Sequence, residues 1–381
     1  MTNDFEYVIV GAGSMGCAAA YHLARSRRSV LLLEQFEIGH TRGSSHGESR
    51  IIRLSYEQPT YIRLAQAAYR LWAELETDAG QKLVFRTGGL DLSAPYNPTF
   101  EACVAGLTAL HVPRELLDTA QLRRRYAQFY VPDGTLGLYQ GDAGILNPIQ
   151  CVMLMAQRAA AYGAAIREHT PVRSIRLTDS GAQVATEYDV YQCRKLIISV
   201  GPWSQPFLQR IGIDLPLVVT QEQYAFFKPQ HPDKFQPDQF PVFIHYGIPQ
   251  DGQRIDYYGF PIFGRSGVKV GEHHGGPVVT ADTRSFDVDP IRLQRLSNYV
   301  GATLPDTQGE VIDAATCLYT NTPDHHFVID ALPGFPHAVI ASPCSGHGFK
   351  FSILIGRILA ELAATGKTEY PLEMFALKRF G

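Results

Sequence analysis

The first 34 residues constrain the fold more than any other part of this chain. Residues 7–10 are an apolar, β-branched run of the kind found in a buried strand, and residues 11–16 follow at once as a glycine-rich turn. Residues 17–24 have a helical pattern, and a second apolar run, 29–33, ends on the acidic residue Glu34. Strand, glycine turn, helix, strand and acid in this order are the fingerprint of a βαβ unit that binds a dinucleotide.

Each part of this fingerprint has a physical task. Gly11 permits the tight turn, Gly13 lets the backbone approach a pyrophosphate, and Gly16 lets the helix pack close to the strand. The helix N-terminus offers free N–H groups to the phosphates. The Glu34 carboxylate can accept hydrogen bonds from an adenosine ribose and would repel a 2′-phosphate. A glycine-rich turn alone is weak evidence, but with two flanking strands and the acid the sequence predicts a dinucleotide cofactor.

Length and composition exclude several classes of protein. A chain of 381 residues, 45% apolar and 19% charged, is typical of an ordinary globular protein with two closely joined domains. The net charge of −3 gives no basic footprint for nucleic acid, and the sequence has no apolar run of about 18 residues that would span a membrane. Because the N-terminus lacks the apolar stretch of a signal peptide, we expect a cytoplasmic protein.

The cysteines are widely spaced and form no Cys-x-x-Cys pair, so we expect no metal site. Disulfides are not expected in a chain of this size without a secretion signal. We interpret most of the cysteines as small buried hydrophobic residues. They are Cys17, Cys103, Cys151, Cys193, Cys317 and Cys344.

Polar and cationic residues follow the second strand. Residues 41–49 form a loop rich in hydroxyl groups, at the place where the middle of a dinucleotide would lie. Arg50 and Arg53 come next, and their spacing would put them on one face if the segment were helical. The alternative is a solvated loop with ordinary surface charge, and the pattern alone leaves both interpretations open.

The remaining chain alternates between helical and strand patterns. Helical patterns cover 61–79, 98–127, 151–162 and 291–300, strand patterns occur within 165–200, 217–227 and 253–272, and the proline-dense segment 229–249 predicts a loop. Near the C-terminus, a buried strand, a glycine loop and a helix from about residue 349 to 364 repeat the logic of the N-terminal unit. Lys350 lies in the first turn of that helix, where a cation opposes the helix dipole, and this suggests a ligand site.

The whole chain resembles the flavin-dependent amine oxidases of the monomeric sarcosine oxidase family, which includes N-methyltryptophan oxidase and pipecolate oxidase. The matching segments occur in the family's order over nearly the full length. They are residues 11–16, 43–53, 257–261, 317–320, 323–330 and 345–351.

The resemblance implies an α/β (α+β) fold of the D-amino-acid-oxidase and glutathione-reductase type. A Rossmann-like FAD-binding domain would be discontinuous in sequence, and a mostly antiparallel sheet would form the substrate domain. The expected FAD-binding ranges are 1–86, 145–216 and 317–381, and the expected substrate-domain ranges are 87–144 and 217–316.

The resemblance also implies that FAD is attached covalently through its 8α position to Cys317. The thiolate form of the cysteine, and not the thiol, is the nucleophile for that bond, and the alternative is a buried structural cysteine. The other residues implied to bind the cofactor are Gly11, Gly13, Ser14, Met15, Gly16, Glu34, Gln35, Arg42, Ser44, Ser45, Val172, Gly201, Trp203, Gly346, His347, Gly348, Phe349 and Lys350.

The resemblance also implies which residues bind the substrate and which are catalytic. Arg53 and Lys350 would hold a substrate carboxylate, and Tyr258 and Tyr319 would line the pocket. Four further residues are implied as catalytic: Lys269, which would favour electron transfer to O2 on the other flavin face, His273, and Arg50 and His46 beside the flavin ring.

The implied activity is oxidation of a secondary amino acid, sarcosine or another N-methyl amino acid, to an imine that hydrolyses in water. O2 would be reduced to hydrogen peroxide, and the enzyme would be a monomer with no nucleic-acid or membrane partner. A cyclic secondary amino acid, pipecolate or proline, is the alternative substrate. Outside this class, we weigh an NAD-dependent dehydrogenase with the same Rossmann start and a non-catalytic flavoprotein.

Overall fold

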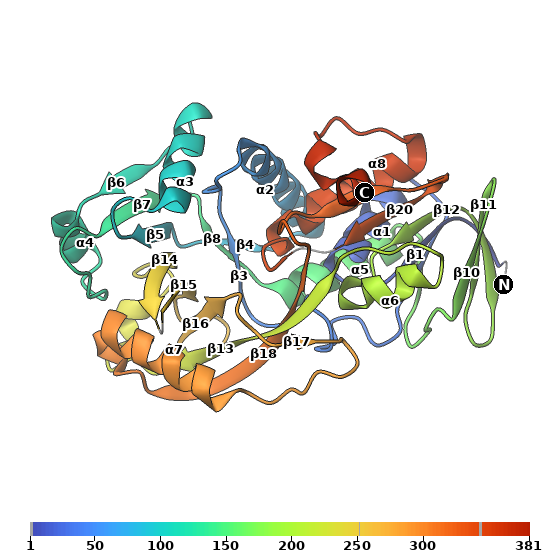
Figure 1. Cartoon of the computed structure of the whole chain (residues 1–381). Helices are drawn as coiled ribbons and strands as arrows, with labels where there is room; N and C mark the ends of the chain where they lie inside the picture. The colour runs from blue at the N-terminus through green and yellow to red at the C-terminus, as the bar shows by residue number, and fades with distance from the viewer. Residues whose placement is uncertain (1–2, 251, 343–344) are drawn as a thin grey trace.

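The structure is a computed structural model that describes residues 3–250, 252–342 and 345–381. In this part of the chain the strands form two large sheets and one small sheet (Figure 1). The α-helices are α1 (Ser14–Arg25), α2 (Pro59–Ala79), α3 (Pro98–Ala109), α4 (Thr119–Arg125), α5 (Pro148–Ala161), α6 (Ser204–Gln209), α7 (Pro290–Thr303) and α8 (Ser352–Thr365).

The first sheet is the nucleotide-binding type that the sequence predicts. Its strands are β1 (Asp4–Val10), β2 (Val30–Leu33), β9 (Ala165–Arg167), β10 (Ser174–Thr178), β11 (Gly181–Ala185), β12 (Val190–Ile198), β19 (Val328–Leu332) and β20 (Phe335–Ser342). β9, β2, β1, β12 and β20 lie side by side and parallel. Because both faces of a parallel sheet are covered, β2 is a continuous buried run rather than an alternating one.

Helices cover one face of this sheet. α1 packs against both α5 and α8, and the apolar side chains of these helices share one core with α2. Gly356 of α8 lies directly against Ala18 of α1, so the two helix backbones approach closely. The predicted helix start near residue 349 is a 3-10 turn, Phe349–Phe351, and the α-helix begins at Ser352.

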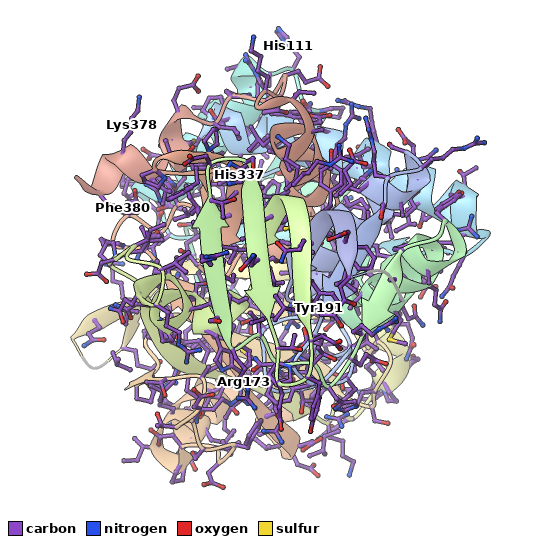
Figure 2. The ribbon with its side chains drawn as sticks, turned by 90° about the vertical axis from the view of Figure 1, so that its right-hand side faces the viewer. His111, Arg173, Tyr191, His337, Lys378 and Phe380 are labelled. Carbon is purple, nitrogen blue, oxygen red and sulfur yellow. The ribbon has the colours of Figure 1, made fainter. Side chains whose placement is uncertain are left out.

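An antiparallel hairpin, β10 and β11, extends the first sheet beside β12. β10, β11 and the first half of β12 face the viewer in Figure 2, with Tyr191 and Arg173 near their lower ends. His337 of β20 lies at the upper end, where its Nε2 is 3.0 Å from the Gly181 carbonyl oxygen. β12 therefore pairs with β11 through its first half and with β20 through its second.

The second sheet is mostly antiparallel. Its strands are β5 (Gly89–Ser93), β6 (Glu115–Leu117), β7 (Leu136–Gln140), β13 (Val218–Phe227), β14 (Val242–Gln250), β15 (Gln253–Phe260), β16 (Val268–His273), β17 (Val278–Val279) and β18 (Val311–Asn321). Among the described strand pairs of this second sheet, only the β5–β14 pair is parallel. α7 packs against β13 and β16 and closes a separate aromatic-rich core.

The third sheet consists of β3 (Arg50–Ile52), β8 (Gly144–Leu146) and β4 (Val84–Arg86), and it decides the conformation of the segment around Arg50. Arg50 lies in a strand and Arg53 follows it, so the two guanidinium groups do not share a helix face. β3 pairs with β8, and Ile51 of β3 and Ile145 of β8 pack with Val242 and Phe260 of the second sheet.

Two other segments also differ from the sequence pattern. The interval 98–127 is not one helical region, because β6 separates α3 from α4 and pairs with β7. The proline-dense interval 229–249 contains most of β14, which pairs with β5 and β15. A bulge between His245 and Ile248 absorbs the irregular part of this strand.

The strands of the first sheet come from three separate ranges of the chain, as a discontinuous cofactor domain requires. β18 joins the second sheet, although the predicted domain boundary at residue 317 falls within it. The division into domains stays a prediction. Among the described residues, no helix combines the length and apolar character that a membrane crossing needs.

The close approach of α1 and α8 generates a stability prediction. In Gly356→Ala, the new Cβ would overlap Ala18 and come within 2.6 Å of the Ala19 backbone nitrogen. We expect a loss of about 1–3 kcal/mol in the free energy of unfolding, measured by urea denaturation. Gly301→Ala in α7 is the matched control, because its Cβ would meet atoms no closer than 3.4 Å and alanine favours a helix. Equal effects of the two substitutions would contradict this packing argument.

Candidate active site

The glycine turn after β1 is built by close backbone contact. Gly11 has φ of +95°, and a Cβ there would overlap the carbonyl oxygen of Ser199 at the end of β12. A Cβ on Gly16 would overlap the carbonyl oxygen of Gly11. Gly13, in contrast, has only the Ser45 hydroxyl near its Cβ position, so its backbone is open to a ligand.

Glu34 lies buried at the end of β2 beside this turn. Its Oε2 accepts a hydrogen bond of 2.7 Å from the Ala12 backbone N–H, and Oε1 accepts one of 3.1 Å from Phe36. The carboxylate is therefore fixed in place and still lines a cavity. A carboxylate held in this way, at the end of the second Rossmann strand, suits a ribose.

Two cavities meet at this turn. One of about 250 Å³ extends from Glu34 past Val172 and Trp203, and the other of about 570 Å³ extends toward Cys317 and Lys350. The residues that line both are Gly13, Ser45, Ser199 and Gly201. The two cavities thus form one path that runs across the helix N-terminus, and an elongated dinucleotide fits that shape and its donor set.

Most of the predicted cofactor residues line this path. The smaller cavity is lined by Gly11, Gly13, Glu34, Gln35, Ser45, Val172, Gly201 and Trp203. The larger is lined by Gly13, Ser14, Met15, Ser44, Ser45, Gly201, Cys317, Gly346, His347, Gly348, Phe349 and Lys350. Gly16 supports the turn from behind, and the exposed Arg42 lies over the Phe36 ring, so a direct role of Arg42 stays a prediction.

Cys317 lies in β18, directly opposite Glu222 in β13. It is buried and lines the larger cavity. Burial raises the pKa of its thiol, while the nearby cations Arg50 and Lys269 act in the opposite direction. The five cysteines that the structure describes are free and buried, and Cys344 lies outside the described residues.

Lys269 of β16 reaches the same cavity from the second sheet. Its Nζ lies 3.4 Å from the Ser49 hydroxyl and 4.0 Å from the centroid of the Tyr224 ring. Burial, reinforced by the positive charge of Arg50, lowers the pKa of Lys269 to about 7. This side chain can therefore gain or lose a proton near neutral pH.

Arg53 is held by residues that sequence reasoning missed. Its Nη1 donates to Asp91 at 3.0 Å and to Tyr246 at 2.8 Å, and a third bond goes to Ser55. Nε and Nη2 make no hydrogen bond with any described residue, and Arg53 lines the cavity. One edge of the guanidinium is thus fixed by the protein, and the other is free to bind an anion.

Lys350 approaches Arg53 through a shared aromatic ring. Its Nζ donates to the Tyr56 hydroxyl and to the His347 carbonyl oxygen, both at 2.8 Å. The Tyr56 ring centroid lies 5.3 Å from Lys350 Nζ and 5.1 Å from Arg53 Cζ. Two cations from opposite ends of the chain therefore flank one tyrosine, which sequence reasoning also missed.

The predicted wall residues form a connected group. His273 Nδ1 lies 3.4 Å from the Tyr319 hydroxyl, and the His273 ring contacts that of Tyr258 edge-on. Burial lowers the pKa of His273 well below its usual value. The neighbouring His274 also lines the cavity and packs against His325.

Arg50 and His46 occupy different positions relative to the cavity. Arg50 lines it and donates to the backbone oxygens of Ser44 and Ser49. His46 is buried behind the lining, and its Nε2 has no partner among the described residues. Burial, with the positive charge of Arg50, lowers the pKa of His46 to about 3, so the ring is neutral.

Comparison with known proteins gives one family for the whole chain. A family model described as "DAO: FAD dependent oxidoreductase" matches residues 6–362. Monomeric sarcosine oxidase from Bacillus sp. (strain NS-129) is 36% identical and covers 100% of this chain and 98% of that protein. N-methyl-L-tryptophan oxidase from Escherichia coli (strain K12 / DH10B) is 32% identical over 99% of each. The resemblance drawn from the sequence motifs is confirmed.

Solved structures agree with the predicted fold class. The open form of NikD, an amino acid oxidase of nikkomycin biosynthesis, has a TM-score of 0.88 at 24% identity and covers 98% of both chains. L-proline dehydrogenase from P. horikoshii has a TM-score of 0.86 at 22% identity, with 100% of this chain and 98% of that chain covered. The α/β fold is confirmed, and the match to an FAD-dependent family favours a flavin over the alternative NAD cofactor.

The low pKa of Lys269 predicts a pH-dependent cost in stability. The folded protein binds this proton only below about pH 7, whereas an unfolded lysine keeps it up to about 10.5. The cost of burying the charge is thus complete below pH 7 and is lost as the pH rises to 10.5. Lys269→Met should raise the free energy of unfolding by roughly 2–4 kcal/mol at pH 6 and by much less at pH 10.

Urea unfolding at both pH values measures this difference. Lys228→Met is the matched control, because the Lys228 side chain is 62% exposed and pairs with Glu310 at the surface. Its effect should be small at both pH values. A gain for Lys269→Met that is the same at pH 6 and pH 10 would contradict the assignment.

Proposed function

Because the chain belongs to the family of FAD-dependent oxidoreductases described as DAO, we propose that it oxidises a secondary amino acid, sarcosine or another N-methyl amino acid. It is a flavin-dependent enzyme that acts on amine CH–NH donors. The observation that carries the substrate proposal is the pair of cations, Arg53 and Lys350, around Tyr56 in the cavity that Cys317 also lines. Two converging cations suit a substrate with a carboxylate.

FAD bound in these cavities would supply the redox chemistry: two electrons from the substrate would pass through it to O2 and give hydrogen peroxide. The residues that line the joined cavities would hold it, with the glycine turn and Ser45 available to the phosphates and Glu34 available to the ribose. The imine product leaves the cavity and hydrolyses in water.

Arg53 binds the substrate carboxylate through Nε and Nη2, since Nη1 is occupied. Lys350 adds a second charge and Tyr56 keeps its ammonium in place. This anchor turns the α-amine and its methyl carbon toward the part of the cavity between Tyr258 and Cys317. Orientation of the substrate is the main contribution of these side chains.

Lys269 and His273 have different roles in the reaction. Lys269, with its pKa of about 7, holds or releases a proton at Nζ near neutral pH, and we assign it to the reaction with O2. His273 stays neutral and orders the pocket through Tyr319. Arg50 and His46 are assigned to the polar surroundings of the ring system, Arg50 at the cavity surface and His46 behind it.

The finer features also stand as proposals. We propose a monomer, which the relatives named monomeric sarcosine oxidase support, and a cytoplasmic enzyme. The cofactor ranges 1–86, 145–216 and 317–381 and the substrate ranges 87–144 and 217–316 complete the proposal. Covalent attachment of FAD at Cys317 is supported by the position of this thiol in the cavity lining, near Arg50 and Lys269, which favour its thiolate.

A peroxide assay tests the activity. Purified enzyme should produce hydrogen peroxide with sarcosine or N-methyl-L-alanine, and pipecolate and proline test the cyclic alternative. Removing Arg53 alone would leave Asp91 buried without its partner, so the variant should combine Arg53→Met with Asp91→Asn. We expect KM for sarcosine to rise by roughly 100-fold, the value of a lost charge-assisted contact, while KM for dimethylamine, which has no carboxylate, changes little.

Asp91→Asn alone is the control for this experiment, because it keeps Arg53 and should retain most of the affinity for sarcosine. Equal losses for sarcosine and dimethylamine would remove the carboxylate anchor. If none of the secondary amino acids gives peroxide, the proposed function itself is wrong.

Covalent attachment is tested by acid precipitation. The yellow colour of FAD should stay with the precipitated wild-type protein and move to the supernatant in Cys317→Ser, because a hydroxyl group is too weak a nucleophile to form the bond. Cys103→Ser is the matched control, since Cys103 is a buried thiol that lines the same cavity. Release of the colour from the wild-type protein would contradict attachment.

A further inference from the structure

The larger cavity extends past Arg53 to residues that the proposed reaction does not use. Thr99 and Cys103 of α3 line it there, together with Glu57, which precedes α2, and Asp256 of β15. α3 lies beside β5 and β7, away from the Rossmann sheet (Figure 1). This end of the cavity is therefore where a side chain of the substrate would project.

Asp256 is placed by the second sheet. In the register of β15 and β16 it lies directly opposite His273, and it shares a strand face with Tyr258 two residues later. Side chains opposite one another on antiparallel strands have Cβ atoms roughly 5 Å apart. Asp256 thus belongs to the same face of the sheet as the predicted active-site residues.

One oxygen of this carboxylate is engaged and the other is free. Oδ1 accepts a hydrogen bond of 2.7 Å from the Gly247 backbone N–H, in the bulge of β14. Oδ2 has no hydrogen bond, and neither oxygen lies within ion-pair distance of a cation, among the residues that the structure describes. Burial raises the pKa of Asp256, while the Gly247 N–H and the positive charge of Arg53 act in the opposite direction.

The charges in this cavity are unevenly distributed. Lys269, Lys350 and Arg53 supply cations at the inner end, although Asp91 already balances Arg53. At the outer end, Asp324 is paired with Arg379, but Asp256 and the exposed Glu57 have no ion-pair partner among the described residues. An elongated ligand with an anionic head and a cationic tail matches this arrangement.

We propose that Asp256 is a specificity residue for the substrate side chain, and that the preferred substrates are secondary amino acids whose side chain ends in an ammonium or guanidinium group. The inference rests on the proposed function, because it takes the carboxylate to be held by Arg53 and Lys350. Oδ2 of Asp256 then accepts a charge-assisted hydrogen bond from the end of the side chain. The same carboxylate disfavours acidic side chains.

Binding without turnover gives the first test. The ω-amino acids from 4-aminobutanoate to 6-aminohexanoate have the carboxylate and the cationic end but no α-amine, and butanoate to hexanoate are their neutral matches. Titration calorimetry on the holoenzyme should give a Kd at least about tenfold lower for one ω-amino acid than for its match. In Asp256→Asn, which still accepts the Gly247 N–H, the ratio should fall to about 1.

Turnover separates the side chain from the α-amine. For the wild-type enzyme, kcat/KM should be at least about tenfold higher for Nα-methyl-L-lysine than for Nα-methyl-L-norleucine. Asp256→Asn should remove this preference and leave kcat/KM for sarcosine within about twofold. Asp233→Asn makes the same change in net charge at an exposed position in the 3-10 turn Pro232–Phe235 and should preserve the preference.

Two results would overturn the inference. The first is a Kd ratio near 1 between each ω-amino acid and its neutral match with the wild-type enzyme. The second is an equal loss in Asp256→Asn for sarcosine, Nα-methyl-L-lysine and Nα-methyl-L-norleucine, because Asp256 would then act on the amine that all three share. In either case, peroxide formed from sarcosine would leave the proposed function intact, whereas failure of all secondary amino acids would reject that function first.

Discussion

The contact between the first turn and the end of β12 determines the rest of the molecule. Gly11 packs against the Ser199 backbone, and Gly16 packs against Gly11, so β1, β12 and the start of α1 meet without an intervening side chain. This leaves the carboxyl ends of the parallel strands next to a helix N-terminus, with a cavity on each side of the junction. The two cavities are continuous at the glycine turn because no side chain of Gly11 or Gly16 fills the space between them.

Local sequence predicts the parts of this arrangement that are made by neighbouring residues. The turn at Gly11, the acid at the end of β2 and the helices α1, α2 and α8 follow from hydrophobic period and glycine spacing within about 25 residues. The sequence also indicates Lys350 as a ligand residue, from a cation placed against a helix dipole, although Lys350 lies in the 3-10 turn that precedes α8.

Residues whose roles depend on distant partners were not predictable in this way. Arg53 is fixed by Asp91, 38 residues away, and by Tyr246, 193 residues away, while Tyr56 and Lys350 are 294 residues apart. Nothing in the local pattern distinguishes these tyrosines from core aromatics. β14 was missed for a related reason, since it is a strand through pairing with β5 and β15 and its prolines conceal this locally.

Buried charge has different consequences at different places in this protein. Arg292 of α7 bridges Glu222 of β13 and Glu272 of β16, and Arg295 also pairs with Glu272. Such a network adds little net stability compared with apolar packing, but removal of one charged partner is costly. The network therefore favours a single arrangement of α7 on the sheet.

That arrangement bears on the site, because Glu222 is opposite Cys317 in the strand register and Glu272 immediately precedes His273. The charges of this network pair with one another and connect α7 to β13 and β16. Arg53 and Asp256, which each keep an atom without a hydrogen bond to the described residues, line the cavity. At these two positions a ligand can complete the hydrogen bonds that the protein leaves open.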